Sequence, residues 1–194
     1  MPDLTPPNQR PVQVQLEVDI VQTDRVAVWV TSIFSYRDAF TFELNIRKKE
    51  STKYIDTYGF GRPPSDQTAG QVLFGMEFAD GSVVSNLPNQ RRSALHFSHS
   101  WGGRQAAGTR FYSELLPVPG DAIVYFAWPY YGIGESNTRV NTDPILEASQ
   151  QAIVLWDEKS DVIHTVPEDE AELAIPSGGW FEKQAGSGGG SISA

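Results

Sequence analysis

Alternating apolar and polar side chains near the start of the chain constrain its fold most strongly. Between positions 12 and 20, every even residue is apolar and every odd residue is polar or charged. Two more runs follow, after the turn sequences Thr23-Asp24 and Tyr36-Arg37-Asp38. Residues 26–30 place three valines on one face and Ala27 and Trp29 on the other, and residues 40–47 alternate apolar and polar side chains again. A period of two residues indicates strands. Because the connections are short, sequential antiparallel pairing is favoured, and this part predicts a three-stranded meander.

The strand pattern continues to residue 140. Asp80-Gly81 marks the turn of a hairpin, and Gly75 within its first strand indicates a bulge or a close backbone approach. Pro129 ends the most apolar strand, because proline has no N–H to donate to a neighbouring strand. The remaining strands are expected at 95–99, at 111–116, at 121–128, which is the central one, and at 136–140, a short edge strand.

A helix is predicted over residues 143–156. Asp143 can cap it and Pro144 suits its first position. Ile145, Ala148, Ala152, Ile153 and Trp156 give the stripe of an amphipathic helix, which we expect to bury Ile153 and Trp156 against the sheet. The sequence therefore predicts a mainly β fold: a single antiparallel β-sandwich of about seven to nine strands with one C-terminal helix.

Four segments are expected along the chain. They are a flexible N-terminal lead (1–10), the sandwich domain with its closing helix (11–156), an acidic extension (157–175) and a flexible Gly/Ser tail (176–194). Within the domain, residues 50–70 are too long for an ordinary hairpin loop. They are either a loop folded over a sheet edge or a lid over a ligand site.

The charge of the chain is unevenly distributed. The net charge is −9, and residues 157–172 contain seven acids and one lysine, which is −6 of that total. This segment is either a solvated tail or a docking strip for a basic partner. Nucleic acid is a disfavoured partner, since phosphates need a clustered basic surface, and the short run Arg47-Lys48-Lys49 is expected to be solvated.

Several other classes are also disfavoured. No apolar run approaches the roughly 20 residues that span a bilayer, and the first residues lack the apolar stretch of a secretion signal. A cytoplasmic location without membrane contact is therefore expected. There is no cysteine, which excludes disulfides and thiolate metal sites.

Few residues point to chemistry. His96 and His99 are three apart in a predicted strand, so they should face opposite sides and cannot share a metal without a distortion. No Gly-x-Ser-x-Gly motif is present, and the glycine-rich pieces TYGFGR and SWGGRQ have the composition of turns. No catalytic residue, metal site or cofactor is assigned.

One cluster is a candidate binding site. Its members lie at or near predicted strand ends, and they are Trp101, Arg104, Trp128, Tyr130 and Tyr131. Exposed rings beside an arginine suit stacking on a sugar or anchoring of a partner protein. Alternatively, these rings fill the rim of the core.

Several motifs together resemble a family of uncharacterised actinobacterial proteins. The motifs are FGMEFADG (Phe74–Gly81), Gly102–Gly103, Leu116–Gly120, Trp128–Pro129 with Gly132–Ile133, and the run Asp143–Trp156. The strand pair ending in Tyr36 and AFTFELNI also fits, so the resemblance covers about residues 11–156. The chain departs from the family pattern in a thinner glycine turn and in Ala127, where an acid is expected. The resemblance implies a domain type, without an activity or catalytic residues.

Three functions remain open from the sequence. The first is a non-enzymatic cytosolic interaction module that binds another protein. The second is a module for a small ligand or carbohydrate that uses the rings of Trp101, Tyr130 and Tyr131. The third is a hydrolase whose site is assembled only in three dimensions.

Overall fold

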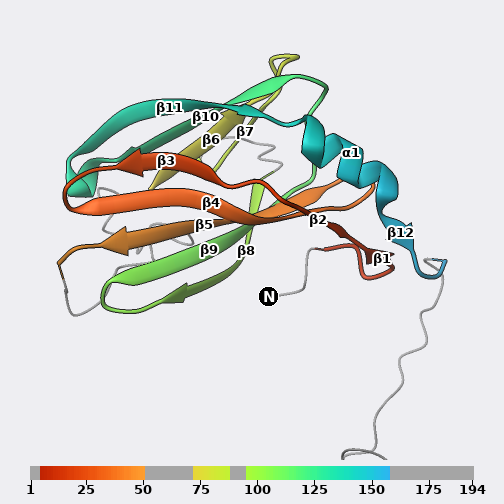
Figure 1. Ribbon diagram of the computed structural model, residues 1–194, viewed down its shortest axis with the longest axis horizontal. Helices are drawn as coiled ribbons and strands as arrows, with labels where there is room; N and C mark the ends of the chain where they lie inside the picture. Colours follow the sequence, from red (N-terminus) through yellow and green to blue (C-terminus); the bar gives the residue numbers. More distant parts are fainter. Residues whose placement is uncertain (1–4, 51–71, 88–94, 158–194) are drawn as a thin grey trace, which may run out of the picture. The chain divides into compact units, whose positions relative to one another are not determined.

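The computed structural model describes residues 5–50, 72–87 and 95–157, except for the side chain of Tyr130. They belong to one compact unit of mainly antiparallel β structure with one α-helix, as the alternation predicts (Figure 1). The possible lid, most of the acidic extension and the Gly/Ser tail lie outside the described residues.

The first sheet has six strands in the order β2-β4-β5-β9-β8, and β3 also pairs with β4. Their bounds are β2 Val12–Val14, β3 Val18–Gln22, β4 Val26–Ser35, β5 Phe40–Lys48, β8 Leu95–Gly102 and β9 Ala106–Ser113. The predicted meander is confirmed, because β3, β4 and β5 pair sequentially and antiparallel. The run 12–20 is broken in two: the Leu16 N–H donates to the Val14 carbonyl at 3.0 Å, so the ladder is interrupted there.

The second sheet has four strands in the order β11-β10-β6-β7. Their bounds are β6 Leu73–Glu77, β7 Val83–Ser85, β10 Asp121–Trp128 and β11 Ile133–Asn141. The central position of β10 and the edge position of β11 confirm the predicted places of these runs, but β11 has nine residues and is longer than the short strand expected at 136–140. Gly75 lies opposite Ser85, and a Cβ at Gly75 would lie 3.2 Å from the Ser85 Cβ, so the glycine marks a close approach.

The two sheets pack face to face around an apolar core, which makes the fold a sandwich. Phe42 and Phe111 from the first sheet meet Phe74 from the second, with ring centroids 5.3–5.7 Å apart. The described residues contain twelve strands, more than the expected seven to nine. The broken edge strand and two short strands at the ends of this unit account for most of the excess.

The helix α1 is shorter than predicted and spans Asp143–Gln151. Thr142 is its N-cap residue and Asp143 is already helical, so the prediction that Asp143 caps the helix was wrong. The backbone of Ala152 is extended, with ψ of 134°. Ile145 and Ala148 are buried, whereas Ile153 is 44% and Trp156 is 55% exposed. The prediction that the helix buries Ile153 and Trp156 was wrong, because the chain leaves the helix before reaching them.

The residues after α1 form a small ribbon with the start of the chain. Strand β12 (Ile153–Val154) pairs antiparallel with β1 (Gln9–Arg10). The ribbon is extended by two bonds of Asn8, whose carbonyl accepts from the Leu155 N–H at 2.8 Å and whose side chain donates to the Trp156 carbonyl at 3.2 Å. Residues 8–10, expected in a flexible lead, are therefore tied to the domain, and Asn8 is buried.

Candidate functional site

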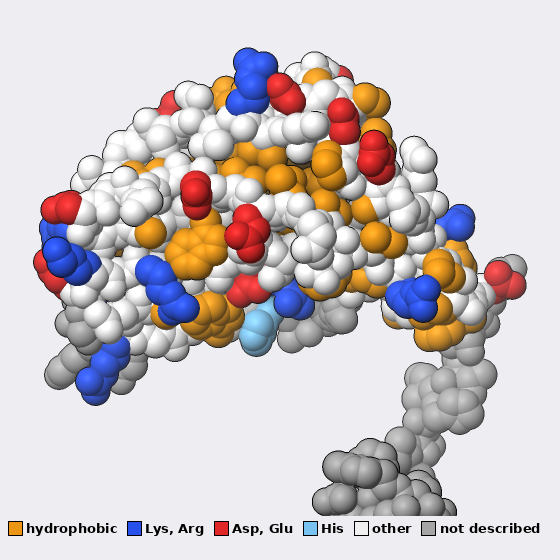
Figure 2. Space-filling view, in the orientation of Figure 1, with side chains coloured by type: hydrophobic (Ala, Val, Ile, Leu, Met, Phe, Trp, Pro, Cys, Tyr) orange, Lys and Arg blue, Asp and Glu red, His pale blue; other side chains and the backbone are white. Residues whose placement is uncertain are grey.

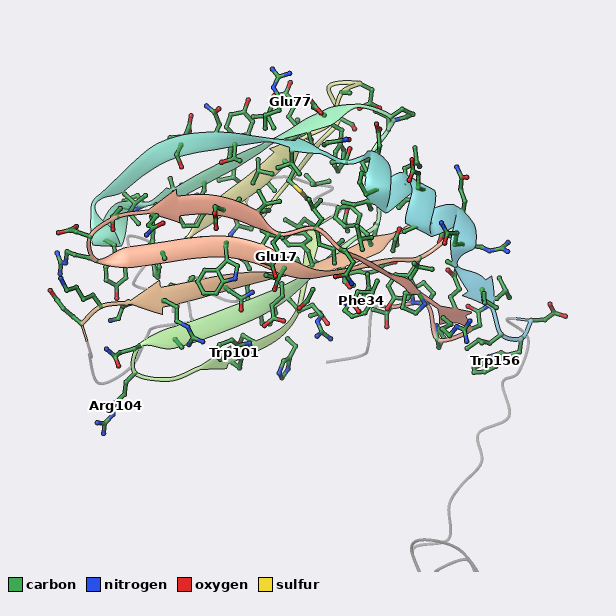
Figure 3. All side chains as sticks on the ribbon, in the orientation of Figure 1. Glu17, Phe34, Glu77, Trp101, Arg104 and Trp156 are labelled. Atoms are coloured by element: carbon green, nitrogen blue, oxygen red, sulfur yellow. The ribbon has the colours of Figure 1, made fainter. Side chains whose placement is uncertain are left out.

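The predicted cluster does not form one surface. Trp101 lies on the outer face of the six-stranded sheet, and Arg104 follows it in the β8–β9 turn and points away from the sheet (Figure 3). Trp128 is inside the core, with 1% of its surface exposed. Tyr131 belongs to a short 3-10 helix, η3 (Pro129–Tyr131). The structure thus leaves Trp101 as the exposed ring of the cluster among the described side chains.

Trp128 and Tyr131 form a separate group with Lys48. The two rings meet edge to face with centroids 4.4 Å apart. The Lys48 ammonium donates to the Tyr131 hydroxyl at 3.0 Å and lies 5.3 Å from the centre of that ring. Lys48 is 5% exposed, so the expectation that it is solvated was wrong. The alternation of β5 explains this, because even-numbered residues of that strand point inward.

Trp101 is held in place on the sheet. Its Nε1 donates to Glu43 Oε1 at 2.7 Å. The residue opposite Trp101 is Gly108, and a Cβ there would lie 2.5 Å from Nε1. The indole therefore occupies the space that any larger side chain at position 108 would take. With 40% of Trp101 still exposed, part of the ring remains available to a ligand.

Polar groups surround this ring in two cross-strand rows. The first row contains Trp101 and is Asp19, Trp29, Asn45, Gly108 and Trp101. The second row lies next to the first and consists of Thr31, Glu43, Arg110 and His99. Asn45 Nδ2 donates to Thr31 Oγ1 at 3.0 Å, which fixes the amide between the rows. This face therefore combines two indoles with fixed hydrogen-bonding groups.

His96 and His99 lie on the same face of the sheet. They pair with Tyr112 and Arg110, which are two apart in β9 and so point the same way. The prediction of opposite faces was wrong, because a shift of register between Phe97 and His99 inserts an extra residue. No group of three or more metal-binding side chains occurs within the described parts of the chain.

His96 has an acidic neighbour. Its Nε2 lies 2.8 Å from Glu114 Oε1, which is an ion pair only when the imidazole is protonated. Among the described residues this nitrogen has no partner with hydrogen-bond geometry, and it is shielded from water. The His96 ring lies 6.3 Å from the Tyr112 ring, and burial, followed by the charges of Asp38 and Glu114, raises the pKa of Tyr112. Tyr112 is therefore a neutral, partly buried ring on this face.

The opposite outer face of the sandwich carries a hollow of about 240 Å³. Leu73, Val83 and Leu87 contribute apolar walls, with Gly75 and Tyr125 between them. The Tyr125 hydroxyl donates to Glu77 at 3.2 Å, and this bond is the main cause that raises the pKa of Tyr125. The hollow is smaller than the roughly 300–1,000 Å³ of typical ligand pockets.

Comparisons with known proteins find no matching family model, curated protein or solved structure. None of the helices in the described ranges is long and apolar enough to cross a membrane. Two surfaces of the chain itself are candidate binding sites: the ribbon of β1 and β12, and the outer face of the six-stranded sheet.

Proposed function

We propose that this chain is a non-enzymatic interaction module that binds a partner protein at its terminal ribbon, defined as β1, β12, Leu155 and Trp156. The observation that supports the proposal is a run of four consecutive large apolar residues, 153–156, each at least 40% exposed. Figure 2 shows hydrophobic side chains gathered over this ribbon, beside basic ones. A contiguous exposed apolar patch marks an interaction site more often than scattered single residues do.

The ribbon is fixed to the domain, so its apolar residues are presented on a preformed backbone. The Arg37 N–H donates to the Gln9 side chain at 2.9 Å, and Arg37 Nε donates to the Ala152 carbonyl at 3.3 Å. In the described residues the ribbon has two strands, and each pairs only with the other. Its outer backbone edges are therefore suited to an added strand.

The charge of the neighbouring sequence indicates the partner's chemistry. Asp157 follows the ribbon directly and begins the segment with seven acids and one lysine. Arg10 and Arg37 lie at the ribbon, but the acids outnumber them. We therefore assign the partner as an extended segment that alternates apolar residues with lysine or arginine. Such a segment can place apolar side chains on Trp156, and its positive charge is complementary to the net charge of the acidic sequence that follows.

The experiment is selection from a phage-displayed peptide library on the full chain. Enriched peptides should alternate apolar and basic residues, and their affinity should fall with added salt, since exposed charges are screened. Trp156→Ala should weaken binding about tenfold or more, as the loss of an aromatic anchor does. Trp101→Ala is the matched control, because it removes another exposed tryptophan at a distant site, and it should bind normally.

Two results would contradict this function. One is enrichment of no basic peptide, or equal binding by the Trp156→Ala variant. The other is a concentration-dependent dimer in sedimentation that Trp156→Ala abolishes, which would assign the ribbon to a second copy of the chain. Carbohydrate binding, the second candidate, is favoured by a different surface, the outer face of the six-stranded sheet.

A further inference from the structure

The outer face of the six-stranded sheet carries several aromatic side chains among the described residues, Trp29 and Trp101 among them. Register places two rings of a third cross-strand row, Phe34 and Tyr112, beside the rows that hold Trp29 and Trp101. Figure 2 shows hydrophobic side chains on this face separated by acidic and basic ones, and Figure 3 places Glu17, Phe34 and Trp101 on it. Helix α1 instead contacts β2 and β4 at one end of the sandwich, where Ser35 donates to the Ile145 carbonyl at 2.8 Å.

The side chain of Trp101 is preorganised for stacking on a ligand. The bond to Glu43 and the space above Gly108 set the position of the indole. A ring that is already fixed loses little freedom on binding, which strengthens an otherwise weak contact. Its exposed surface suits the flat apolar face of a sugar ring, and the nearby Asn45 and Arg110 offer hydrogen bonds to hydroxyl groups.

The net charge of the face distinguishes between anionic and uncharged ligands. Among the described residues four acids lie on it, Glu17, Asp19, Glu43 and Glu114, against two arginines, Arg47 and Arg110. Single-stranded nucleic acids also stack their bases on aromatic rings, but their phosphate backbone needs a basic groove. A net negative face disfavours them and favours an uncharged ligand.

We propose that the outer face of the six-stranded sheet binds a neutral oligosaccharide, with one pyranose ring stacked on Trp101 and the chain running along the row toward Trp29. Three strand spacings separate the two tryptophans, which is about 14 Å between their backbones. That length accommodates several sugar units. Glu43 positions the indole, and Asn45, Arg110 and His99 contact hydroxyl groups.

The experiment uses the full chain and a panel of neutral hexasaccharides: cello-, manno-, xylo- and maltohexaose. Binding is measured by calorimetry and by tryptophan fluorescence, because a sugar stacked on an exposed indole changes its emission. At least one panel member should bind. Trp101→Ala should reduce its affinity about tenfold or more, since a tenfold loss corresponds to about 1.4 kcal/mol. Glu43→Ala should cause a smaller loss by releasing the indole.

Gly108→Ala tests whether the position of the Trp101 indole matters, because it displaces the ring without removing it. Its Cβ would collide with the indole, so sugar affinity should fall while the melting temperature stays near that of the original chain. Trp156→Ala is the matched control and should bind sugar normally. Because the peptide test depends on Trp156 and the sugar test depends on Trp101, the failure of one proposal is distinguishable from the failure of the other.

Three outcomes would overturn the inference. The first is that no hexasaccharide of the panel binds. The second is that a panel member binds Trp101→Ala as well as it binds the original chain. The third is that a sulfated oligosaccharide or a single-stranded oligonucleotide binds through Trp101 while every neutral sugar fails, which would show that the ligand is anionic.

Discussion

Trp101 illustrates how a residue can be selected from sequence while its surroundings cannot. An aromatic residue beside a glycine turn was a sensible candidate. Its hydrogen-bond acceptor, Glu43, is 58 positions away, and nothing in the local sequence connects them. Gly108 carries no signal of its own either, because its lack of a side chain matters only once β8 lies beside β9. The site is therefore a product of strand register.

Asp80 gives a pH-dependent prediction at the scale of a single residue. The Ser82 hydroxyl and N–H donate to Asp80 Oδ1 at 2.6 and 2.9 Å, and these bonds lower the pKa of Asp80 from 3.8. Because the folded pKa is below the unfolded one, the stabilisation is complete above pH 3.8 and is lost as the pH falls through the folded value. Asp80→Ala should therefore destabilise the protein at neutral pH and less so in acid.

The measurement is the free energy of unfolding of both proteins at a series of pH values. The gap between them should narrow steadily below pH 3.8. A gap that stays constant down to strongly acidic pH would show that Asp80 acts through the shape of the turn and not through its charge.

At the scale of elements, helix α1 shows where periodicity was misleading. Residues 145–152 follow the helical stripe, and the same stripe fits Ile153 and Trp156. However, β1 offers backbone hydrogen bonds to an extended chain at that point, and pairing with it replaces the last turn or so of the predicted helix, residues 152–156. The competing partner is more than 140 residues away in sequence, as Asn8 and Trp156 show. A pattern within one segment cannot reveal it.

The end of the helix yields a paired mutational prediction. Ile145 is 4% exposed and Ile153 is 44% exposed. Ile145→Asp should cost several kcal/mol, about 3 or more, because it buries an unpaired charge. Ile153→Asp should change the free energy of unfolding by about 1 kcal/mol or less, as surface substitutions do. Urea denaturation of both variants checks this, and equal losses would mean that the helix continues through Ile153.

At the scale of the whole molecule, alternation was a sufficient guide to architecture. It predicted the meander, the hairpin at Asp80-Gly81, the central β10 and the edge strand β11, all of which the structure contains. Strand order within the six-stranded sheet was not predictable, because β9 joins β5 across the long interval that contains β6, β7 and β8. That pairing depends on how the two sheets pack around one core. Local patterns in a single sequence do not indicate which distant strands pair.

The core between the layers gives a prediction for the whole fold. Phe111 is 1% exposed and touches both Phe42 of its own sheet and Phe74 of the other. Phe111→Ala should lower the free energy of unfolding by about 3–5 kcal/mol, because it removes a large buried ring and leaves a cavity. Thermal or urea unfolding measures the loss. Trp101→Ala is the control and should lower the free energy of unfolding much less. A comparable loss would show that the exposed Trp101 ring stabilises the fold as much as a core ring does.

The pairing of β1 with β12 also affects how this protein is made. During synthesis β1 emerges before β12, because its residues Gln9 and Arg10 precede their partners Val154 and Ile153 by 145 and 143 positions. Contacts so distant in sequence slow the search for the native state, because the chain between them must close into a loop first. Nascent chains that have not yet released Trp156 should therefore leave β1 open to proteases. Pairing of β1 with β12 should then protect β1 from cleavage. A chain truncated before Ile153 lacks β12, so its β1 should stay sensitive to proteases.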